Sequence, residues 1–538
     1  MKSKIYIYSF IAAFSLALFG CSLNEDPKDQ MPEGEAFKSP KLIYLNTVAN
    51  LYTEIGGSGG GSGLAGTDRG VYDLNTFTAD EALLPTRGGD WFDGGLWQDM
   101  FKHAWKTDNS VIKNGWEYLY RVIGKANQSL DKLNLLIEQN PDNKFLPVYK
   151  AEVRALRAMY YYYLLDLYAR VPIVETATMK IADVKQSTRS EVFAFVKKEL
   201  EESMPYLSTA SSARQGEYYG RMTRPVAFFL MAKLALNAQV YADNDWTDNN
   251  GVPNGTATFT IGGASKTPWQ ATIAYCDSIT ALGYTLEADF SKNFSVNNET
   301  SKENIFVIPM DPVLFSARNM NLVRSRHYAH AKAYSQDGWN GASATKEALA
   351  IFRKESVDPR MGKTYFLGKV YGPDGSPVMD GNNELEYKPD ALALDVSGST
   401  NEKTAGARMA KYELDKTAQA GGQLVHNDWV LFRYADVLLM KSEALVRAGQ
   451  NGDNELQTVR ARAGAEARTA TLATLLDERM LEFAWEGIRR QDLIRFGKFH
   501  QPISDRPTSA PYRSVFPIPV DVLSLNKNLT QNPGYTNQ

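Results

Sequence analysis

The sequence predicts a mostly α-helical protein, built from tetratricopeptide-like helical pairs that long loop-rich segments interrupt. Three observations lead to this prediction. Apolar residues recur at helical spacing over several long stretches, and breaks such as Asn140-Pro141-Asp142 separate the members of a pair. Segments rich in Gly, Asn, Asp and Ser lie between the pairs. The fold class is therefore an interrupted α-solenoid with a second, irregular region.

The first pair of helices is predicted at 111–137 and 147–168. In the second of these, apolar residues step by three or four positions and so share one face: Val153, Leu156, Tyr160, Tyr163 and Leu167. Pro172 ends this helix, because proline cannot continue the backbone hydrogen-bond pattern.

Further pairs are predicted by the same reasoning, at 190–206 with 225–241, 428–448 with 454–463, and 472–485 with 487–498. Helical pairs thus occupy about 111–241 and 428–498. The irregular regions are predicted at about 56–109 and 245–427, where Gly, Asn, Asp and Ser are frequent.

The chain begins with a short apolar stretch that predicts a lipoprotein-type signal peptide over 1–20. Two lysines precede the apolar residues 5–20, which are fewer than the roughly 20 that a transmembrane helix needs. The ending Leu18-Phe19-Gly20-Cys21 resembles a bacterial lipoprotein box, in which the signal is cut before an acylated cysteine. We therefore predict lipidation at Cys21 and a polar tether over 21–40. The alternative is an ordinary signal peptide with a cysteine near its end by chance.

Cysteine usage points to a fold that rests on its hydrophobic core. Cys276 is the only cysteine besides Cys21, so acylation of Cys21 would leave no intramolecular disulfide. Cys276 lies in the apolar stretch 271–279, which predicts a helix in which the thiol is a small buried residue.

Composition limits the classes of partner and cofactor. The net charge of −3 gives no reason to expect nucleic acid as a partner. The close pair His327 and His330 lacks a Cys or Glu-x-x-His context, so the sequence predicts no metal site and no cofactor. The oxygen-rich loop 243–251 lacks the glycine and the distal glutamate of an EF-hand, and calcium binding there stays open. The 28 tyrosines and 9 tryptophans suit either a core or a surface for partly apolar ligands.

Four stretches, in order behind the lipoprotein signal, carry a family resemblance. They are Ala151-Glu152-Val153-Arg154 leading to Val171-Pro172, Leu431-Phe432-Arg433-Tyr434-Ala435-Asp436, Val459-Arg460-Ala461-Arg462 leading to Asp492-Leu493-Ile494-Arg495, and Phe516-Pro517-Ile518-Pro519 before Asn532-Pro533-Gly534-Tyr535. This set resembles the SusD/RagB family of outer-membrane nutrient-binding lipoproteins of Bacteroidetes, over nearly the whole chain.

The resemblance implies a single SusD-like domain over 41–538, with helical pairs on one side and a ligand face of loops on the other. It implies a non-catalytic protein that captures an oligosaccharide and passes it to a SusC-like TonB-dependent transporter barrel. It also implies a lipid-anchored location at the outer membrane. The acidic Glu25-Asp26 after Cys21 resembles the signal that directs such lipoproteins to the extracellular face.

The loop 86–95 resembles the family loop in which a tryptophan stacks on sugar. Trp91 would be the aromatic platform, and Arg87, Asp90 and Asp93 would bond the sugar hydroxyls. The starch-binding pattern has Asn where Gly94 stands, so the resemblance does not carry over the same glycan. The alternative is that Trp91 and Trp97 pack under the loop.

A second candidate is Gly338-Trp339-Asn340-Gly341, because a tryptophan between glycines lies on a turn rather than in a core. Trp339 and Asn340 are therefore predicted to contact ligand. In the family a second aromatic residue approaches from this part of the chain, and Tyr328 is a further candidate.

Carboxylate pairs could instead indicate a surface glycoside hydrolase. The candidates are Asp80-Glu81, Asp477-Glu478, and Glu482 with Glu486. The last pair is expected at i,i+4 on one helix, where Arg479, Arg489 and Arg490 would form an ionic network with it. We therefore predict no catalytic residues. A binder of peptide or another nutrient in the same transport role would also fit the sequence, as would a protein scaffold.

Overall fold

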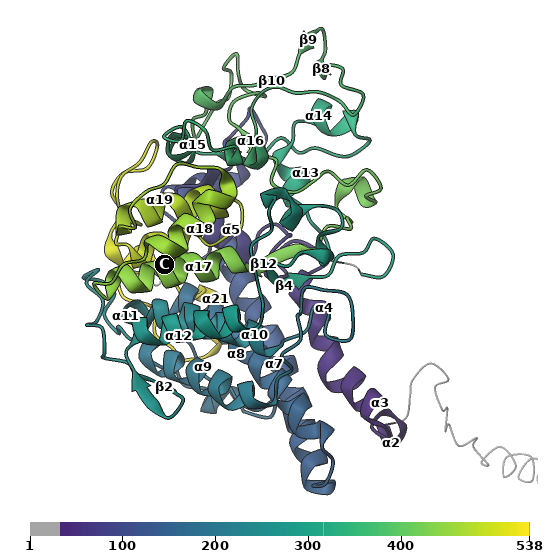
Figure 1. Ribbon diagram of the computed structural model, residues 1–538, viewed down its shortest axis with the longest axis vertical. Coiled ribbons are helices and arrows are strands. Elements are labelled where there is room, and N and C mark those ends of the chain that lie inside the picture. Colours follow the sequence, from purple (N-terminus) through teal and green to yellow (C-terminus); the bar gives the residue numbers. More distant parts are fainter. Residues whose placement is uncertain (1–32, 316, 537–538) are drawn as a thin grey trace, which may run out of the picture. The chain divides into compact units, whose positions relative to one another are not determined.

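A computed structural model describes residues 33–315 and 317–536 (Figure 1). The predicted signal peptide, Cys21 and most of the predicted tether lie outside the described residues. The chain divides into two compact units, the first ending at Asn46 and the second spanning Thr47–Gln538. In the described part of the chain, each helix is too short or too polar to cross a membrane.

The first unit contains two short helices, α2 (Glu33–Ala36) and α3 (Pro40–Tyr44). The α3 helix begins at a favourable sequence, because the Ser39 hydroxyl accepts a hydrogen bond from Leu42 N at 3.3 Å and proline stands at the first helical position.

The second unit is dominated by helices, which confirms the predicted mostly α class. Their bounds are α4 (Asn50–Gly56), α5 (Val71–Thr76), α6 (Leu96–Phe101), α7 (Ser110–Gln139), α8 (Phe145–Tyr168), α9 (Arg189–Ser203), α10 (Arg224–Leu236), α11 (Ala238–Tyr241), α12 (Pro268–Ala281), α13 (Asn321–Ser325), α14 (Tyr328–Ala333), α15 (Lys346–Phe352), α16 (Arg360–Thr364), α17 (Tyr434–Arg447), α18 (Asp453–Ala463), α19 (Leu472–Phe483), α20 (Arg489–Arg495) and α21 (Val520–Leu525).

Local sequence explains where several long helices begin and end. The Asn109 side chain accepts from two backbone amides of the first turn of α7. Thr188 and Glu191 form a capping box at the start of α9. Gly464 ends α18 in the left-handed conformation, with φ of 69°.

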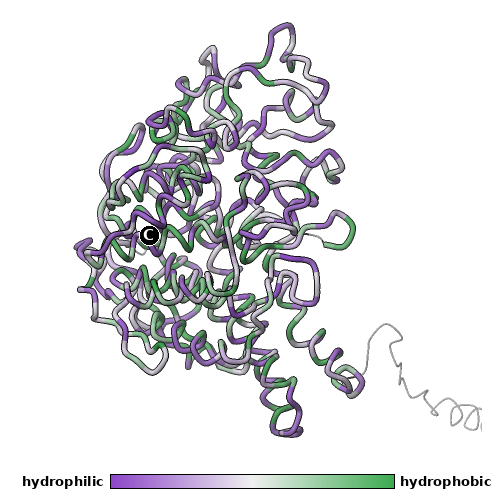
Figure 2. Tube along the Cα trace, in the orientation of Figure 1, coloured by the Kyte–Doolittle hydropathy of each residue, from purple (hydrophilic) through white to green (hydrophobic). Residues whose placement is uncertain are grey.

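Helices that follow one another in the chain pack together, and three of the predicted pairs are found: α7 packs on α8, α17 on α18, and α19 on α20. The α9 helix, predicted to pair with α10, packs mainly on α8. The α10 helix packs mainly on α12, which follows a loop and the small hairpin β2–β3, and α12 in turn packs on α17 (Figure 1). Hydrophobic and hydrophilic residues alternate along the turns of these helices in Figure 2. Cys276 in α12 is buried, as predicted, and is a free thiol.

Several predicted helical boundaries are wrong. The predicted helix 487–498 ends at Arg495, and the predicted helix 225–241 is divided into α10 and α11. Residues 429–433, expected in a helix, form the strand β12, and α17 begins only at Tyr434, after the extended residue Arg433. The α19 helix ends at Phe483, because Ala484 is extended and Trp485 has a positive φ of 69°. Glu482 and Glu486 therefore do not lie on one helix.

The strands are short and occur as antiparallel pairs. The pairs are β1 (Ala82–Leu83) with β5 (Ser343–Ala344), β2 (Phe259–Ile261) with β3 (Ala264–Lys266), β4 (Asn304–Ile308) with β12 (Trp429–Arg433), β6 (Tyr365–Phe366) with β11 (Arg408–Met409), β7 (Gly368–Lys369) with β10 (Glu386–Tyr387), and β8 (Met379–Asp380) with β9 (Asn383–Glu384). Most of these pairs join segments that are far apart in sequence. They hold the loop-rich region together, and α13 to α16 lie between them (Figure 1).

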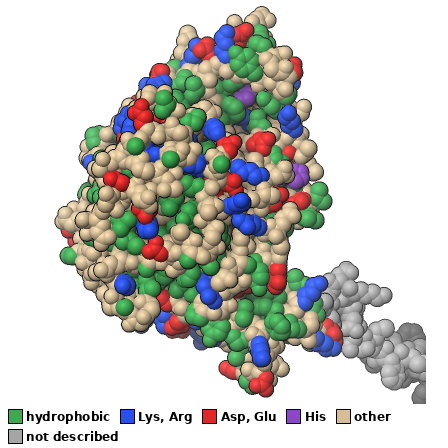
Figure 3. Space-filling view, viewed as in Figure 1, with side chains coloured by type: hydrophobic (Ala, Val, Ile, Leu, Met, Phe, Trp, Pro, Cys, Tyr) green, Lys and Arg blue, Asp and Glu red, His purple; other side chains and the backbone are tan. Residues whose placement is uncertain are grey.

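The visible face of the molecule carries acidic and basic side chains of both signs, interspersed with hydrophobic ones (Figure 3). This agrees with the small net charge of −3.

Candidate functional site

The two predicted tryptophan loops meet in the structure. Strands β1 and β5 pair with Leu83 opposite Ser343, which brings the chain after β1 beside the chain before β5. The Trp91 indole Nε1 then donates to the Trp339 carbonyl oxygen at 3.0 Å. Gly341 lies against the Trp91 ring, and a Cβ there would approach the ring to 2.6 Å. A glycine is therefore required at this contact.

Trp97 and Asp93 form the base of the first loop. The Trp97 side chain is buried, and its Nε1 donates to the Asp93 carboxylate at 2.7 Å. Asp93 also accepts from Arg69 at 2.9 Å. The Trp97 ring meets the edge of Trp91, with 6.3 Å between ring centroids. Trp97 thus packs under the loop, whereas Trp91 is half-buried and keeps part of its ring exposed.

Three further aromatic residues lie on the segments that meet at Trp91. Tyr328 is 41% exposed, and its hydroxyl donates to the exposed Asp90 carboxylate at 2.8 Å. Phe92 is 52% exposed, and Trp339 is half-buried. We call Trp91, Phe92, Tyr328 and Trp339 the aromatic loop surface. Phe92 was not among the residues predicted to bind ligand. Its position beside Trp91 in a glycine-rich loop could have indicated that role.

Arg87 and Asn340 lie behind this surface and not on it. Arg87 is buried and donates to the carbonyl oxygens of Glu402 at 2.6 Å and Ala405 at 2.8 Å. Asn340 is buried, donates to Lys403 O at 2.9 Å, and accepts from the buried Arg408 at 2.9 Å. These side chains tie the two tryptophan loops to a third loop, 402–408, and so hold the loops in one arrangement.

The two arginines buried behind the aromatic loop surface, Arg87 and Arg408, have pKa values below the ordinary range of arginine. Burial and the neighbouring charge of Arg408 lower the pKa of Arg87 to about 8. Burial likewise lowers the pKa of Arg408 to about 10. In the described part of the chain, neither guanidinium forms an ion pair with a carboxylate. The terminal nitrogens of both donate chiefly to backbone oxygens, and each Nε is buried without a partner. The exposed Asp90 carboxylate lies on the surface in front of them.

The carboxylate pairs that could suggest a hydrolase have other roles here. Asp80 is paired with Arg489 at 2.7 Å, and Glu81 beside it is buried. Asp477 pairs with Lys354 at 2.8 Å. Glu482 is buried among arginines that are distant in sequence, which corrects the predicted partners Arg479, Arg489 and Arg490.

The described residues contain no group of three or more His, Cys, Asp or Glu side chains placed to hold a metal ion. In the loop 243–251, Asp245 and Asp248 accept hydrogen bonds from Thr247 and Asn250 of the same loop. His327 and His330 are both buried.

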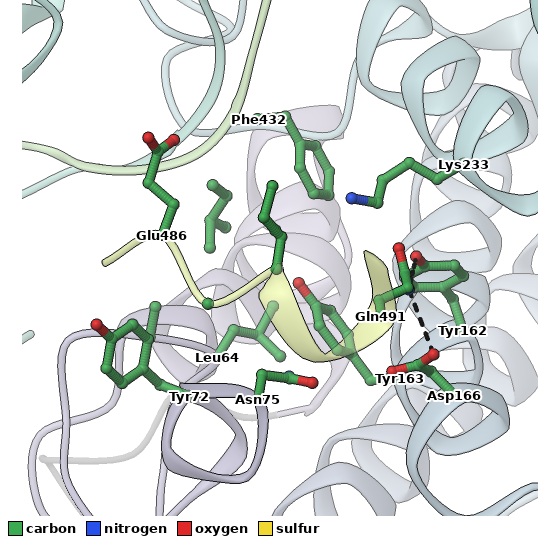
Figure 4. A pocket seen from close by; sticks show the side chains of 14 residues that line it. Leu64, Tyr72, Asn75, Tyr162, Tyr163, Asp166, Lys233, Phe432, Glu486 and Gln491 are labelled. Carbon is green, nitrogen blue, oxygen red and sulfur yellow. Dashed lines mark hydrogen bonds between the residues drawn. The ribbon is translucent and has the colours of Figure 1, made fainter. Parts of the chain in front are cut away.

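A small cavity lies among α5, α8, α10, β12 and α20, and it shares no lining residue with the aromatic loop surface (Figure 4). Its volume is about 40 Å³, which suits water and excludes a sugar ring. Gln491 reaches across its wall to Tyr162 at 2.6 Å and Asp166 at 3.3 Å. This cavity is therefore too small to be the binding site of a sugar.

Comparison with known proteins adds family evidence to this geometry. Residues 246–509 match the model of the SusD family, and residues 86–236 match a model described as "Starch-binding associating with outer membrane". The chain is similar to the starch-binding protein SusD of Bacteroides thetaiotaomicron, with 23% identity over 99% of this chain and 100% of that protein.

Solved structures share the fold. The chain is similar to surface glycan-binding protein A of Bacteroides thetaiotaomicron in complex with laminarihexaose, with a TM-score of 0.68, 21% identity, and coverage of 91% of this chain and 99% of that one. It is also similar to a SusD superfamily protein of Bacteroides vulgatus, with a TM-score of 0.69, 20% identity, and coverage of 93% and 100%.

Proposed function

Because the chain belongs to the SusD/RagB family, we propose that it is a non-catalytic glycan-binding lipoprotein of the outer membrane. In this role it captures an oligosaccharide at the cell surface and delivers it to a SusC-like TonB-dependent transporter. Names of relatives support glycan as the ligand, since they include starch-binding and laminarihexaose-bound proteins.

The observation that carries the proposal is the aromatic loop surface. The exposed Phe92 and Tyr328, with the half-buried Trp91 and Trp339, offer apolar area that the C–H groups of a sugar ring can cover. The Asp90 carboxylate and the Tyr328 hydroxyl oxygen supply acceptors for sugar hydroxyls beside the rings.

Arg87 and Asn340 have a supporting role in this proposal. Their hydrogen bonds hold the loops in place before the ligand arrives, which reduces the entropy lost on binding. Asp93 supports Trp97 in the same way.

Replacing Tyr328 with alanine is expected to weaken binding of the preferred glycan about tenfold or more. The variant loses an exposed ring and the hydroxyl that orients Asp90, and a tenfold loss corresponds to about 1.4 kcal/mol. The measurement is affinity electrophoresis against a polysaccharide panel, followed by calorimetric titration. Tyr206→Ala is the matched control, because Tyr206 is 53% exposed on the helical side of the chain.

Unchanged affinity of Tyr328→Ala and of Phe92→Ala would remove the aromatic loop surface as the binding site. Polysaccharide recovered after the titration should keep its chain length. Shortened chains that depend on a single Asp or Glu of this protein would contradict the non-catalytic proposal.

The anchor and the transporter can be tested together. We expect Cys21→Ser to leave the domain folded but to release it from membranes that lack the transporter, because stable anchoring needs more than one acyl chain and a serine cannot carry them. In membranes that contain the transporter, the same variant should be retained and should co-purify with a barrel-sized protein in mild detergent. Full retention without a transporter contradicts the anchor, and purification alone with a transporter contradicts the delivery complex.

A further inference from the structure

Arg189 is a buried cation that lacks a polar partner. It is the first residue of α9 and is 1% exposed. Within the described residues its guanidinium donates no hydrogen bond and forms no ion pair, and its Nε is buried without a partner. Two aromatic rings lie against it: its guanidinium carbon is 5.5 Å from the Tyr241 ring centroid and 5.6 Å from that of Trp246.

The side chain lines an open polar pocket of about 290 Å³. The pocket is formed by the start of α9, by α11 and the loop after it, and by the ends of α17 and α20. Exposed Asn249 and Asn250 also line it, so it is open to solvent. Trp246, which lines it too, is buried, and its indole Nε1 is a second donor without a partner.

The other charged groups of the pocket are already engaged. Arg447 and Arg495 both bind Glu443, at 2.7 Å each. Asp243 accepts from Asp245 N at 2.9 Å, and in the described part of the chain it makes no ion pair with Arg189. The first-turn amides of α9 are also used, by Asn244 and Thr188. Among the described residues, the guanidinium of Arg189 therefore feels the charges of Asp166 and Asp243 but has no hydrogen-bond acceptor.

A buried guanidinium without an acceptor is costly, because burial removes its hydration and the two aromatic rings supply no hydrogen bond in its place. Arginine does not escape by losing its proton at neutral pH. Its planar fork of donors matches the paired oxygens of a carboxylate or a sulfate. We propose that the pocket around Arg189 is a second ligand site, which binds a small oxyanion through Arg189 and Trp246. Its volume is near the lower limit for small-molecule pockets, roughly 300 Å³, and fits a single acidic sugar or a free oxyanion.

The site is separate from the aromatic loop surface, since the two share no lining residue. The shared chemistry is an oxyanion, and the two sources are an inorganic ion and the carboxylate of a sugar acid. Calorimetric titration and thermal melting of the purified full chain should therefore use three probes: sodium sulfate, sodium glucuronate and glucose. Sodium chloride at equal ionic strength controls for screening.

We expect saturable binding of sulfate, of glucuronate, or of both, and none of glucose. At a probe concentration of 100 times Kd, the folding equilibrium should shift about 100-fold toward the folded state. Arg189→Met should abolish both responses, whereas Arg214→Met, at an exposed arginine outside the pocket, should keep them. Trp246→Phe keeps a ring but loses the Nε1 donor, and should bind the same probe several-fold more weakly.

Binding of glucuronate alone assigns the site to a sugar acid, and binding of sulfate alone assigns it to a free ion. The proposal is overturned if the wild-type chain responds to the oxyanions no more than to chloride. It is also overturned if folded Arg189→Met, or folded Trp246→Phe should the first variant not fold, binds them as tightly as the wild type.

Discussion

Replacing Glu482 with glutamine is expected to lower the free energy of unfolding by about 3–5 kcal/mol. Glu482 is fully buried, and three guanidinium groups converge on its carboxylate. Arg433 contacts it at 2.5 Å and Arg360 at 2.7 Å, and Arg462 is the third. The amide keeps the shape of the side chain but removes the charge that compensates these buried cations.

The network around Glu482 explains why the loss should be large. Burial alone would raise the pKa of Glu482, but the guanidinium groups of Arg462, Arg433 and Arg360 outweigh burial and hold it well below its ordinary range. Each arginine also reaches a second acid, such as Glu303 for Arg433 at 2.8 Å. The network therefore connects α16, β12, α18 and α19, and a missing charge affects all four.

Chemical denaturation of the two purified chains measures the difference. Asp477→Asn is the matched control, because Asp477 lies on the same helix but pairs with the exposed Lys354. Such a surface pair contributes about 1 kcal/mol or less. If Glu482→Gln costs no more than Asp477→Asn, the buried network does not stabilise the fold as we describe.

The sequence predicted that Glu482 is in an ionic network, but it did not predict the arginines that bind it. An ionic role for Glu482 was predicted from arginines a few residues away, but those arginines bind elsewhere: Arg479 to Asp436 and Asp492, Arg489 to Asp80, and Arg490 to Asp166. The partners of Glu482 come from β12, α16 and α18. Periodicity identifies a helix and its buried face, but it does not identify which distant side chain meets that face.

Helices with long apolar periodicity were predicted well for the same reason. The α7 and α8 helices are within two residues of their predicted bounds. Strand β12 was missed because Trp429 to Arg433 is a short apolar run that joins directly to α17, and its strand character depends on pairing with β4, more than 120 residues earlier.

The candidate site was only partly accessible from the sequence. Both loops were predicted because each has glycines close to a tryptophan. In the structure they are in contact through the Trp91 indole and the Trp339 carbonyl oxygen. That Arg87 and Asn340 face inward could not be read from the sequence, because their acceptors lie on the loop 402–408, which carries no recognisable motif. Whether a polar residue on such a loop meets ligand or backbone is decided by the tertiary packing.

Glutamine in place of Glu81 is expected to stabilise the protein at pH 8 and to leave it nearly unchanged at pH 5. Glu81 is buried, and neither carboxylate oxygen has a hydrogen-bond partner. Burial, followed by the nearby charge of Asp80, raises the pKa of Glu81 from 4.5 to about 8. The folded state therefore holds a proton on Glu81 at pH values where the unfolded chain has released it.

The sign of the pH dependence follows from this difference. Between about pH 4.5 and 8 the folded state binds more protons than the unfolded state, so the contribution of Glu81 to stability falls as the pH rises. It is fully favourable below pH 4.5 and levels off above pH 8. A pKa difference of this size corresponds to roughly 3–5 kcal/mol across the interval. Glutamine stays neutral, so it mimics the protonated acid and removes this loss.

Denaturation curves at pH 5 and pH 8 measure the free energy of unfolding of the wild type and of Glu81→Gln. Glu138→Gln, at an exposed position of α7, is the control for exchanging a carboxylate for an amide. If the gap between Glu81→Gln and the wild type is the same at both pH values, Glu81 is ionised in the folded protein throughout, and burial does not raise its pKa as we describe.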